Sequence, residues 1–446
     1  MASSYAVRST PAETFNKITV SCWFKGHADG TQRNFWGLYD NSSSNRFFAL
    51  YFSTNGSLYG YWKQNEGTFF TLGTSRKFRD PNAWYHFVMT MDTTLSTAAD
   101  RVKFYVNGER VTTFEDGLDT ITQNQTCNLM NGTTDGRMQW GGGKVSGTQY
   151  YFPGGMSHCH MCVGYAYDAS SFGSTDSTTG EWKINTAPSV SYGTNGGFWF
   201  KDGSQLTDSS TNSNTLTASG TLTNTEDCPS DNFCTFNALL PQSNTGLSKG
   251  RTRFETTSGT GWKSMCGTLG MAKNSGKYYM EFKHLGGSYN GYGIADLKNG
   301  GIIDQINQSQ TTYPGEAANS YGYLSQGELH YNASQTGTGW DSYTTNDIIG
   351  MAVDMENMKL YYHKNGTYLQ SGNPSTGSNG YSINDPVGAY FPTATVNAGI
   401  MCANFGNGSF DGTAISSEGS NASGIGKFEY DVPTGYTALS TKGLNE

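Results

Sequence analysis

Apolar and polar residues alternate with a period of two along much of the chain, most clearly in Phe78–Val111. The residues that share one face of its two apolar runs are Tyr85, Phe87, Met89 and Met91, followed by Val102, Phe104 and Val106. This period is typical of a half-buried antiparallel strand, so the stretch predicts two strands. Asn107-Gly108 tolerates the positive φ of a tight hairpin turn, which predicts a return strand from Glu109.

Similar short runs predict strands in both halves of the chain. In the first half they are Ile18–Lys25, Phe35–Asp40, Phe47–Ser53, Ser57–Lys63, Tyr151–Tyr167 and Tyr192–Lys201. In the second half they are Gly276–His284, Tyr292–Ala295, Tyr321–Leu324, Asp347–Val353 and the hairpin Asp354–Gly366. Turn residues separate these runs, and such spacing favours a sandwich or jelly roll over a helical repeat.

Four polar stretches interrupt the pattern. Glu115–Gly147 lacks periodicity and is expected to be a long loop, while Asp208–Thr223 is expected to be a surface loop or a sheet edge. Asn299–Asn319 and Ser371–Asn384 are interpreted as polar insertions. Cys228–Leu240 contains enough apolar residues to predict an ordered, packed connector.

Composition agrees with an all-β chain. There are 58 glycines, 28 tyrosines and 24 phenylalanines in 446 residues, and only 14% of residues are charged, too few for long helices or a coiled coil. The formal charge of −8 and the lack of a basic cluster argue against nucleic acid as a partner. No apolar run is long enough for membrane insertion, and the start of the chain lacks a secretory signal, so we expect synthesis in the cytoplasm.

The first half resembles a known family. The similarity rests on RDP at 79–81, AWYH at 83–86, DTT at 92–94 and RVKFYVNG at 101–108. These motifs resemble the laminin-G-like (concanavalin A-like) jelly-roll domains of structural proteins from tailed bacteriophages, especially marine and cyanobacterial phages. The resemblance implies a virion component with a lectin-type fold, and does not by itself imply sugar binding.

The second half resembles a different family. The motifs are GKYYMEFKH at 276–284, YGIA at 292–295, DMENMKLYYHKNG at 354–366 and NFG at 404–406. They resemble a SPRY domain, a concanavalin A-like sandwich known from protein-interaction modules. We therefore predict two concanavalin A-like β-sandwich domains in tandem: residues 1–222, a connector over 223–240, and residues 241–446.

Metal and carboxylate chemistry has several candidate residues. On one strand, His158, His160 and Cys162 would share a face, but no second ligand pair accompanies them, so alternating core and surface residues are favoured over a zinc site. Glu429 and Asp431 match part of a glycosidase pattern whose third carboxylate position holds Thr434. Asp354 and Glu356 have the right spacing only for a turn, so ordinary surface acids are the favoured interpretation. We assign no catalytic, cofactor or metal-binding residue.

Calcium and glycans are the remaining ligand classes. Asp92, Asp100, Asp116 and Asp119 lie near the central hairpin and could supply oxygen ligands for Ca²⁺, but no spacing is diagnostic. Glycan contact would use exposed aromatic faces beside Asn and Asp, and the aromatic candidates are Trp36, Tyr59, Tyr61, Trp62, Trp140 and Trp340. Most of these rings are expected in the core, because sandwich cores also use aromatic residues.

These observations together predict a non-enzymatic virion protein, present in several symmetric copies and bound to other virion proteins. The favoured role is a tail-associated fibre or adhesin that binds the host surface, with glycans as candidate receptors. Three alternatives stay open: a capsid decoration or head-fibre protein, a polysaccharide-degrading enzyme of concanavalin A fold, and a host-derived interaction module.

Overall fold

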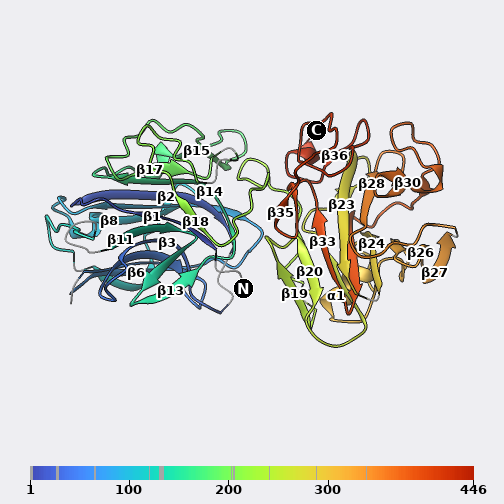
Figure 1. The fold of residues 1–446 in the computed structure, drawn as a ribbon, viewed down its shortest axis with the longest axis horizontal. Helices are drawn as coiled ribbons and strands as arrows, with labels where there is room; N and C mark the ends of the chain where they lie inside the picture. The colour runs from blue at the N-terminus through green and yellow to red at the C-terminus, as the bar shows by residue number, and fades with distance from the viewer. Residues whose placement is uncertain are drawn as a thin grey trace. The chain divides into compact units, whose positions relative to one another are not determined.

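The computed structural model describes residues 4–26, 30–64, 67–119, 121–129, 135–201, 203, 206–240, 242–287, 289–337 and 339–445. It divides into two compact units, residues 1–222 (unit 1) and 223–446 (unit 2). Strands dominate both units (Figure 1). The predicted all-β class, with two β-sandwich domains in tandem, is confirmed.

Unit 1 contains two large antiparallel sheets. The eight-stranded sheet has the order β10 (Phe114–Asp119), β6 (Gly67–Lys77), β5 (Ser57–Gln64), β4 (Arg46–Phe52), β3 (Arg33–Asp40), β11 (Gly136–Trp140), β1 (Tyr5–Ser9) and β18 (Thr217–Ser219). The six-stranded sheet has the order β17 (Gly197–Trp199), β14 (Gly155–Val163), β2 (Lys17–Lys25), β7 (Trp84–Asp92), β8 (Val102–Val106) and β9 (Glu109–Arg110). Two small hairpins, β12 (Gly142–Val145) with β13 (Thr148–Tyr151) and β15 (Gly173–Thr175) with β16 (Trp182–Ile184), complete the unit.

The central hairpin forms as predicted. Strands β7 and β8 pair antiparallel. Asn107 and Gly108, with φ values of 49° and 82°, turn the chain from β8 into the predicted return strand β9, which pairs with β8. Phe87, Met89 and Phe104 point into the core of unit 1. The expectation of half-buried strands is wrong, however, since Val88 and Tyr105 on the opposite face are buried as well.

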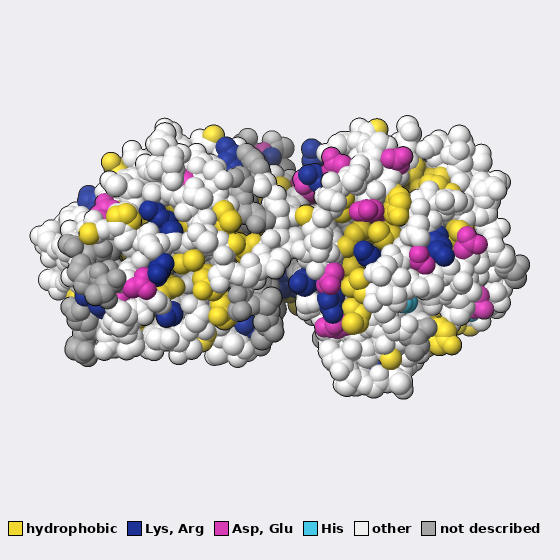
Figure 2. Space-filling view, viewed as in Figure 1, with side chains coloured by type: hydrophobic (Ala, Val, Ile, Leu, Met, Phe, Trp, Pro, Cys, Tyr) yellow, Lys and Arg dark blue, Asp and Glu magenta, His cyan; other side chains and the backbone are white. Residues whose placement is uncertain are grey.

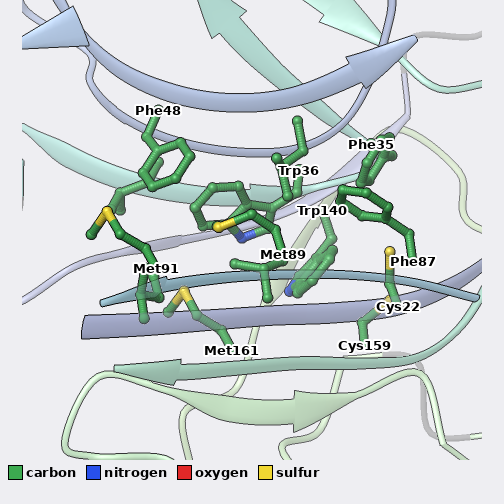
Figure 3. Close-up of a cluster of buried hydrophobic side chains, with 14 of the residues drawn as sticks. Cys22, Phe35, Trp36, Phe48, Phe87, Met89, Met91, Trp140, Cys159 and Met161 are labelled. Carbon is green, nitrogen blue, oxygen red and sulfur yellow. The ribbon is translucent and has the colours of Figure 1, made fainter. Parts of the chain in front are cut away.

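Aromatic and sulfur-containing side chains fill the core of unit 1 (Figure 3). Trp36 meets Phe48 edge-on with ring centroids 5.3 Å apart, and Trp36 and Trp140 lie 6.4 Å apart. Of the six aromatic candidates, most of which were expected in the core, Trp36, Trp62 and Trp140 are core residues with no exposed surface, whereas Tyr59, Tyr61 and Trp340 are half-buried. The three tryptophan rings in the core are therefore unavailable for glycan contact.

Two polar stretches of unit 1 contribute strands to its sheets. The stretch Glu115–Gly147 is not a loop, because it contributes most of β10 and all of β11 and β12. The glycines of β12 allow it to pack closely on β3: a Cβ added to Gly37 would lie 2.9 Å from the Cα of Gly143. Asp208–Thr223 includes β18 at the edge of the eight-stranded sheet, which confirms the edge alternative.

Unit 2 is a second sandwich. Its nine-stranded sheet runs β19 (Thr245–Ser248), β20 (Arg253–Thr256), β33 (Ile400–Asn404), β23 (Lys277–Gly286), β28 (Ile348–Asp354), β29 (Lys359–Lys364) and β30 (Thr367–Tyr368), with β31 (Tyr381–Ser382) beside β29 and β36 (Thr437–Ala438) beside β23. Its seven-stranded sheet runs β21 (Trp262–Cys266), β32 (Ala389–Asn397), β24 (Tyr289–Ala295), β25 (Ser320–Leu324), β26 (Glu328–Tyr331) and β27 (Ser334–Gly337), with β22 (Met271–Ala272) beside β32. A short hairpin joins β34 (Ser409–Phe410) and β35 (Thr413–Ala414).

The remaining stretches of unit 2 depart in part from expectation. Asn299–Asn319 is not simply a polar insertion, because it contains the helix α1 (Ile302–Asn307), whose isoleucines are buried. Residues 223–240 belong to unit 2, where Phe233 and Phe236 are buried as predicted for a packed segment. Leu239 is the exception, since 58% of its surface is exposed.

Candidate functional site

Among the described residues, segments outside the four large sheets pack on the outer faces of three of them. In unit 1, residues 164–192 (strap 1) cover the six-stranded sheet, where Phe172 packs with Val88 and Tyr105. The Tyr105 hydroxyl donates to Asp168 at 2.6 Å, and the indole Nε1 of Trp182 lies 2.9 Å from Nδ1 of His86. Burial lowers the pKa of His86 to about 3, so this imidazole is neutral.

Unit 2 has two such segments. Residues 299–319 (strap 2) pack the isoleucines of α1 against Cys266 and Ala295 of the seven-stranded sheet. Residues 416–436 (strap 3) pack Phe428 and other apolar side chains against Tyr279 and Ala352 of the nine-stranded sheet. These contacts explain why side chains on the outer faces of the three sheets are buried where a strap packs on them.

The fourth outer face, on the eight-stranded sheet of unit 1, is covered only in part. The β12–β13 hairpin packs Val145 near Tyr39, Phe47 and Ala49. Three half-buried tyrosines of the sheet, Tyr51, Tyr59 and Tyr61, and the half-buried Tyr150 of the hairpin form a surface that we call the tyrosine face. It is an aromatic surface on a hydrogen-bonded sheet, so its rings have little freedom to lose when a ligand binds.

The rings of the tyrosine face are held by local packing. Tyr51 and Tyr59 stack with centroids 5.5 Å apart and an interplanar angle of 19°. Tyr59 also lies across Gly73 of β6, because a Cβ added there would fall 2.3 Å from its ring. Tyr61 meets Phe47 edge-on at 4.9 Å.

Carboxylates border this surface on β10. The Tyr59 hydroxyl donates to Glu115 at 3.3 Å, and Glu115 also pairs with Lys77. Hydrogen bonding, first of all from Lys77, lowers the pKa of Glu115 to about 2, so the carboxylate is charged. Burial, followed by the charges of Glu115 and Asp116, raises the pKa of Tyr59 to about 12. The site therefore combines neutral phenols with fixed anionic acceptors.

Sequence reasoning identified Tyr59 and Tyr61 but missed Tyr51 and Tyr150. Tyr51 alternates with the core residues Leu50 and Phe52 on β4, a signal that was available in the sequence. The position of Tyr150 depends on how the β12–β13 hairpin folds onto the sheet, and no local pattern indicates that. Trp340, the remaining aromatic candidate, is half-buried in unit 2, where its ring lies 5.3 Å from that of Tyr323.

The metal-like stretch of β14 does not keep simple alternation. A bulge lies between Ser157 and His160, and His158 adopts a φ of 47°. His160 stacks on Phe198 at 4.0 Å and lies 3.0 Å from the Tyr192 hydroxyl, while burial lowers its pKa. Cys162 packs beneath strap 1. Among the described residues, no three His, Cys, Asp or Glu side chains are grouped as metal ligands.

The candidate carboxylates are dispersed. Glu429 and Asp431 lie in strap 3 outside any strand, and Asp431 accepts hydrogen bonds from the backbone and hydroxyl of Ser420 at 2.7 and 2.9 Å. Asp354 is buried, pairs with Lys277 at 3.1 Å and caps the turn that contains Glu356. The structure therefore does not bring these acids together on one strand.

The aspartates considered for calcium have separate surroundings. Asp92 pairs with Lys17 at 3.0 Å, and Asp100 pairs with Arg110 at 2.8 Å. Asp116 borders the tyrosine face, and the side chain of Asp119 lies outside the described residues.

In the part of the chain that the structure describes, no helix has the length and apolar character needed to span a bilayer.

Two family matches agree with this architecture. Residues 2–159 match a laminin G family described as the concanavalin A-like lectin/glucanases superfamily, and residues 297–408 match the SPRY domain. Unit 1 thus carries a concanavalin A-like domain and unit 2 a SPRY domain. Both are folds of the binding type.

Individual proteins show more limited similarity. A stretch of 57 residues is 33% identical to the dual specificity protein kinase splA of Dictyostelium discoideum, which is 13% of this chain and only 2% of that kinase. Among solved structures, the SPRY domain of human HERC1 has a TM-score of 0.30 and 16% identity over 38% of this chain and 96% of that domain. A SAP-like pentraxin from Limulus polyphemus has a TM-score of 0.27 and 12% identity over 37% of this chain and 72% of its own.

Proposed function

We propose that this protein is a non-catalytic component of a phage particle that attaches to host-surface glycans through the tyrosine face. The observation that carries the proposal is the stacked pair Tyr51 and Tyr59, on a sheet face that, among the described residues, the β12–β13 hairpin covers only in part. Tyrosine offers a rigid aromatic face with a polar end, which suits contact with a ring that is apolar on its faces and hydroxylated at its edge. Asp116, at the border of this face, supplies an acceptor for those hydroxyls.

The particle location belongs to the same proposal. The sequence motifs at residues 79–108, which resemble those of phage proteins, support a virion protein, and two lectin-type sandwiches favour a tail-associated fibre or adhesin. A capsid decoration or head-fibre protein is the second candidate. Antibody labelling of purified particles distinguishes them: we expect label at the tail, whereas label over the head would refute the adhesin role.

Replacing Tyr59 with alanine tests the glycan site. We expect Tyr59→Ala to weaken binding to host-surface polysaccharide by about tenfold, because it removes one stacked ring and a donor to Glu115. The measurement is immobilised-polysaccharide binding by surface plasmon resonance. Tyr165→Ala is the matched control, since this ring is 41% exposed and lies outside the tyrosine face. Equal binding by wild type and Tyr59→Ala would reject the site.

Two other classes make different predictions. A polysaccharide-degrading enzyme would release reducing ends from the host polysaccharide and lose that activity on Glu429→Gln. The proposal predicts no such release, in agreement with the dispersed carboxylates of strap 3. A host-derived interaction module would be a soluble monomer that captures a peptide, whereas a virion protein copurifies with particles in several copies.

A further inference from the structure

A cavity of about 280 Å³ opens in unit 2 beside strand β29, far along the chain from the tyrosine face. Its lining includes Trp340, Tyr361 and Tyr381, together with the amides of Gln370 and Asn379. The eleven described residues that line it are all uncharged. A cavity with aromatic walls and a few polar groups is a typical small-molecule site, and this one has room for about one sugar-sized ring.

The cavity lies at a gap in strand pairing. On its outer edge, β29 pairs with β31 at Leu360 and with β30 at His363, and the two residues between them, Tyr361 and Tyr362, pair with neither. Alternate residues of a strand direct their backbone groups to opposite edges, so one of these two presents its N–H and C=O to the gap. A ligand in the cavity therefore meets backbone as well as side-chain polar groups.

The side chains around the gap have unused hydrogen-bonding capacity. The Tyr361 hydroxyl is buried and has no hydrogen-bond partner among the described residues. Gln370 and Asn379 each use their amide nitrogen, on Gly339 and Ser371 respectively, at 3.0 Å. Within the described chain their amide oxygens accept no hydrogen bond, so the cavity offers both donors and acceptors.

Two glycines let the aromatic walls of the cavity pack directly on the backbone. A Cβ at Gly380 would lie 2.4 Å from the Tyr361 ring, and one at Gly337 would lie 2.4 Å from Nε1 of Trp340. Gln370 and Asn379 both adopt left-handed φ values, 56° and 55°, which are uncommon for residues with a side chain.

We infer that this cavity is a second binding site, and that its ligand is a single neutral saccharide ring. Saccharide hydroxyls both donate and accept, which matches the phenol, amide and backbone groups, and the aromatic walls match the ring faces. A charged sugar would be desolvated here without a counter-charge. An extended peptide fits less well, because strand addition needs a longer free edge than two residues. The inference stands on this geometry and is independent of the tyrosine face.

The test uses the full-length Tyr59→Ala protein, so that binding at the tyrosine face is already weakened. We expect saturation-transfer NMR and calorimetry to detect binding of glucose, galactose, mannose or N-acetylglucosamine to this protein. Glucuronic acid should bind at least fivefold more weakly. Tyr361→Phe removes one hydroxyl and should lower affinity about three- to tenfold. The hydroxyl has no partner to lose, so the melting temperature should not fall.

Tyr436→Phe is the matched control. Its hydroxyl is also buried and without a partner among the described residues, but Tyr436 does not line the cavity. It should leave sugar affinity unchanged. Three results would each overturn the inference: equal sugar affinity of the Tyr59→Ala protein with and without Tyr361→Phe, glucuronic acid binding as tightly as the neutral sugars, or binding of peptides but of no sugar. The tyrosine face is tested separately, by comparing polysaccharide binding of the wild-type protein with that of the Tyr59→Ala variant.

Discussion

Glu281 lies at the centre of a buried hydrogen-bond network in unit 2. Its carboxylate accepts from the Tyr279 hydroxyl at 3.0 Å, from Asn404 at 3.1 Å, and from the backbone N–H groups of Glu429 and Tyr430 at 3.0 and 2.9 Å. The last two contacts attach strap 3 to the sheet. Desolvation raises the pKa of Glu281 to about 7, although these hydrogen bonds favour the anion.

This network predicts a specific pH dependence. The folded-state pKa of Glu281 is above its ordinary value, so the folded protein binds the extra proton, and this contribution to stability falls as pH rises from about 4.5 through 7. Glu281→Gln cannot titrate. The difference in unfolding free energy, wild type minus Glu281→Gln, should therefore decrease between pH 5 and pH 8, as measured by denaturant unfolding.

Taking this difference removes the opposing contributions of buried histidines. His363, next to Tyr279, has its pKa lowered to about 4 by burial, which makes stability rise with pH below 6.5 in both proteins. Glu281→Gln should also cost about 1–3 kcal/mol, because its amide N–H₂ faces hydrogen-bond donors. A difference that is constant or grows with pH would contradict the assignment.

At the scale of elements, the straps decide which sheet faces are available. Strap 1 buries Phe172 against Val88 and Tyr105, and strap 3 buries Phe428 against Tyr279. Both segments consist mostly of loops and short elements, so their order depends on these apolar contacts more than on backbone pairing. Local opening of a strap is therefore expected to require less free energy than opening of the sheet beneath it.

Phe172→Ala tests this for strap 1. Truncating a fully buried phenylalanine costs about 3–5 kcal/mol, and here we expect the loss to appear as local opening of residues 164–192. Hydrogen-exchange mass spectrometry should show faster exchange in strap 1, with β2 and β7 still protected. Phe172→Leu, which preserves most of the apolar volume, should show a much smaller effect. Equal deprotection of strap and sheet would mean that they open as one unit.

At the scale of the whole molecule, each unit has its own core. Phe87 belongs to the core of unit 1, and Phe282 to that of unit 2. Figure 2 shows acidic and basic side chains dispersed over the visible surface of both units, without a large patch of one sign. On this face, acidic and basic side chains are therefore interspersed.

Separate cores predict separate unfolding. Phe87→Ala should destabilise unit 1 by about 3–5 kcal/mol and lower its melting temperature by roughly 10 °C. Hydrogen exchange in residues 223–446 should stay unchanged. Phe282→Ala is the reciprocal variant and should affect unit 2 alone. Loss of protection in both units after either change would show that they unfold together.

The sequence by itself determined the strands of the central hairpin and their inward faces. The period of two placed Phe87, Met89 and Phe104 in the core, and Asn107-Gly108 specified the hairpin turn, because both signals depend on residues close together in the chain. The two domain resemblances gave the fold class for the same reason. Tyr59 and Tyr61 were among the site candidates because aromatic rings suit contact with glycans, and that argument needs only the residue type.

Only the tertiary structure decided what lies on the other side of each sheet. Strap 1 buries faces that the pattern predicts to be exposed, and the β12–β13 hairpin brings Tyr150 to the tyrosine face from a stretch expected to be a loop. The cavity at Tyr361 depends on a pairing gap between β30 and β31. These features arise from contacts between segments far apart in the chain, and alternation along one strand carries no information about which segment will cover it.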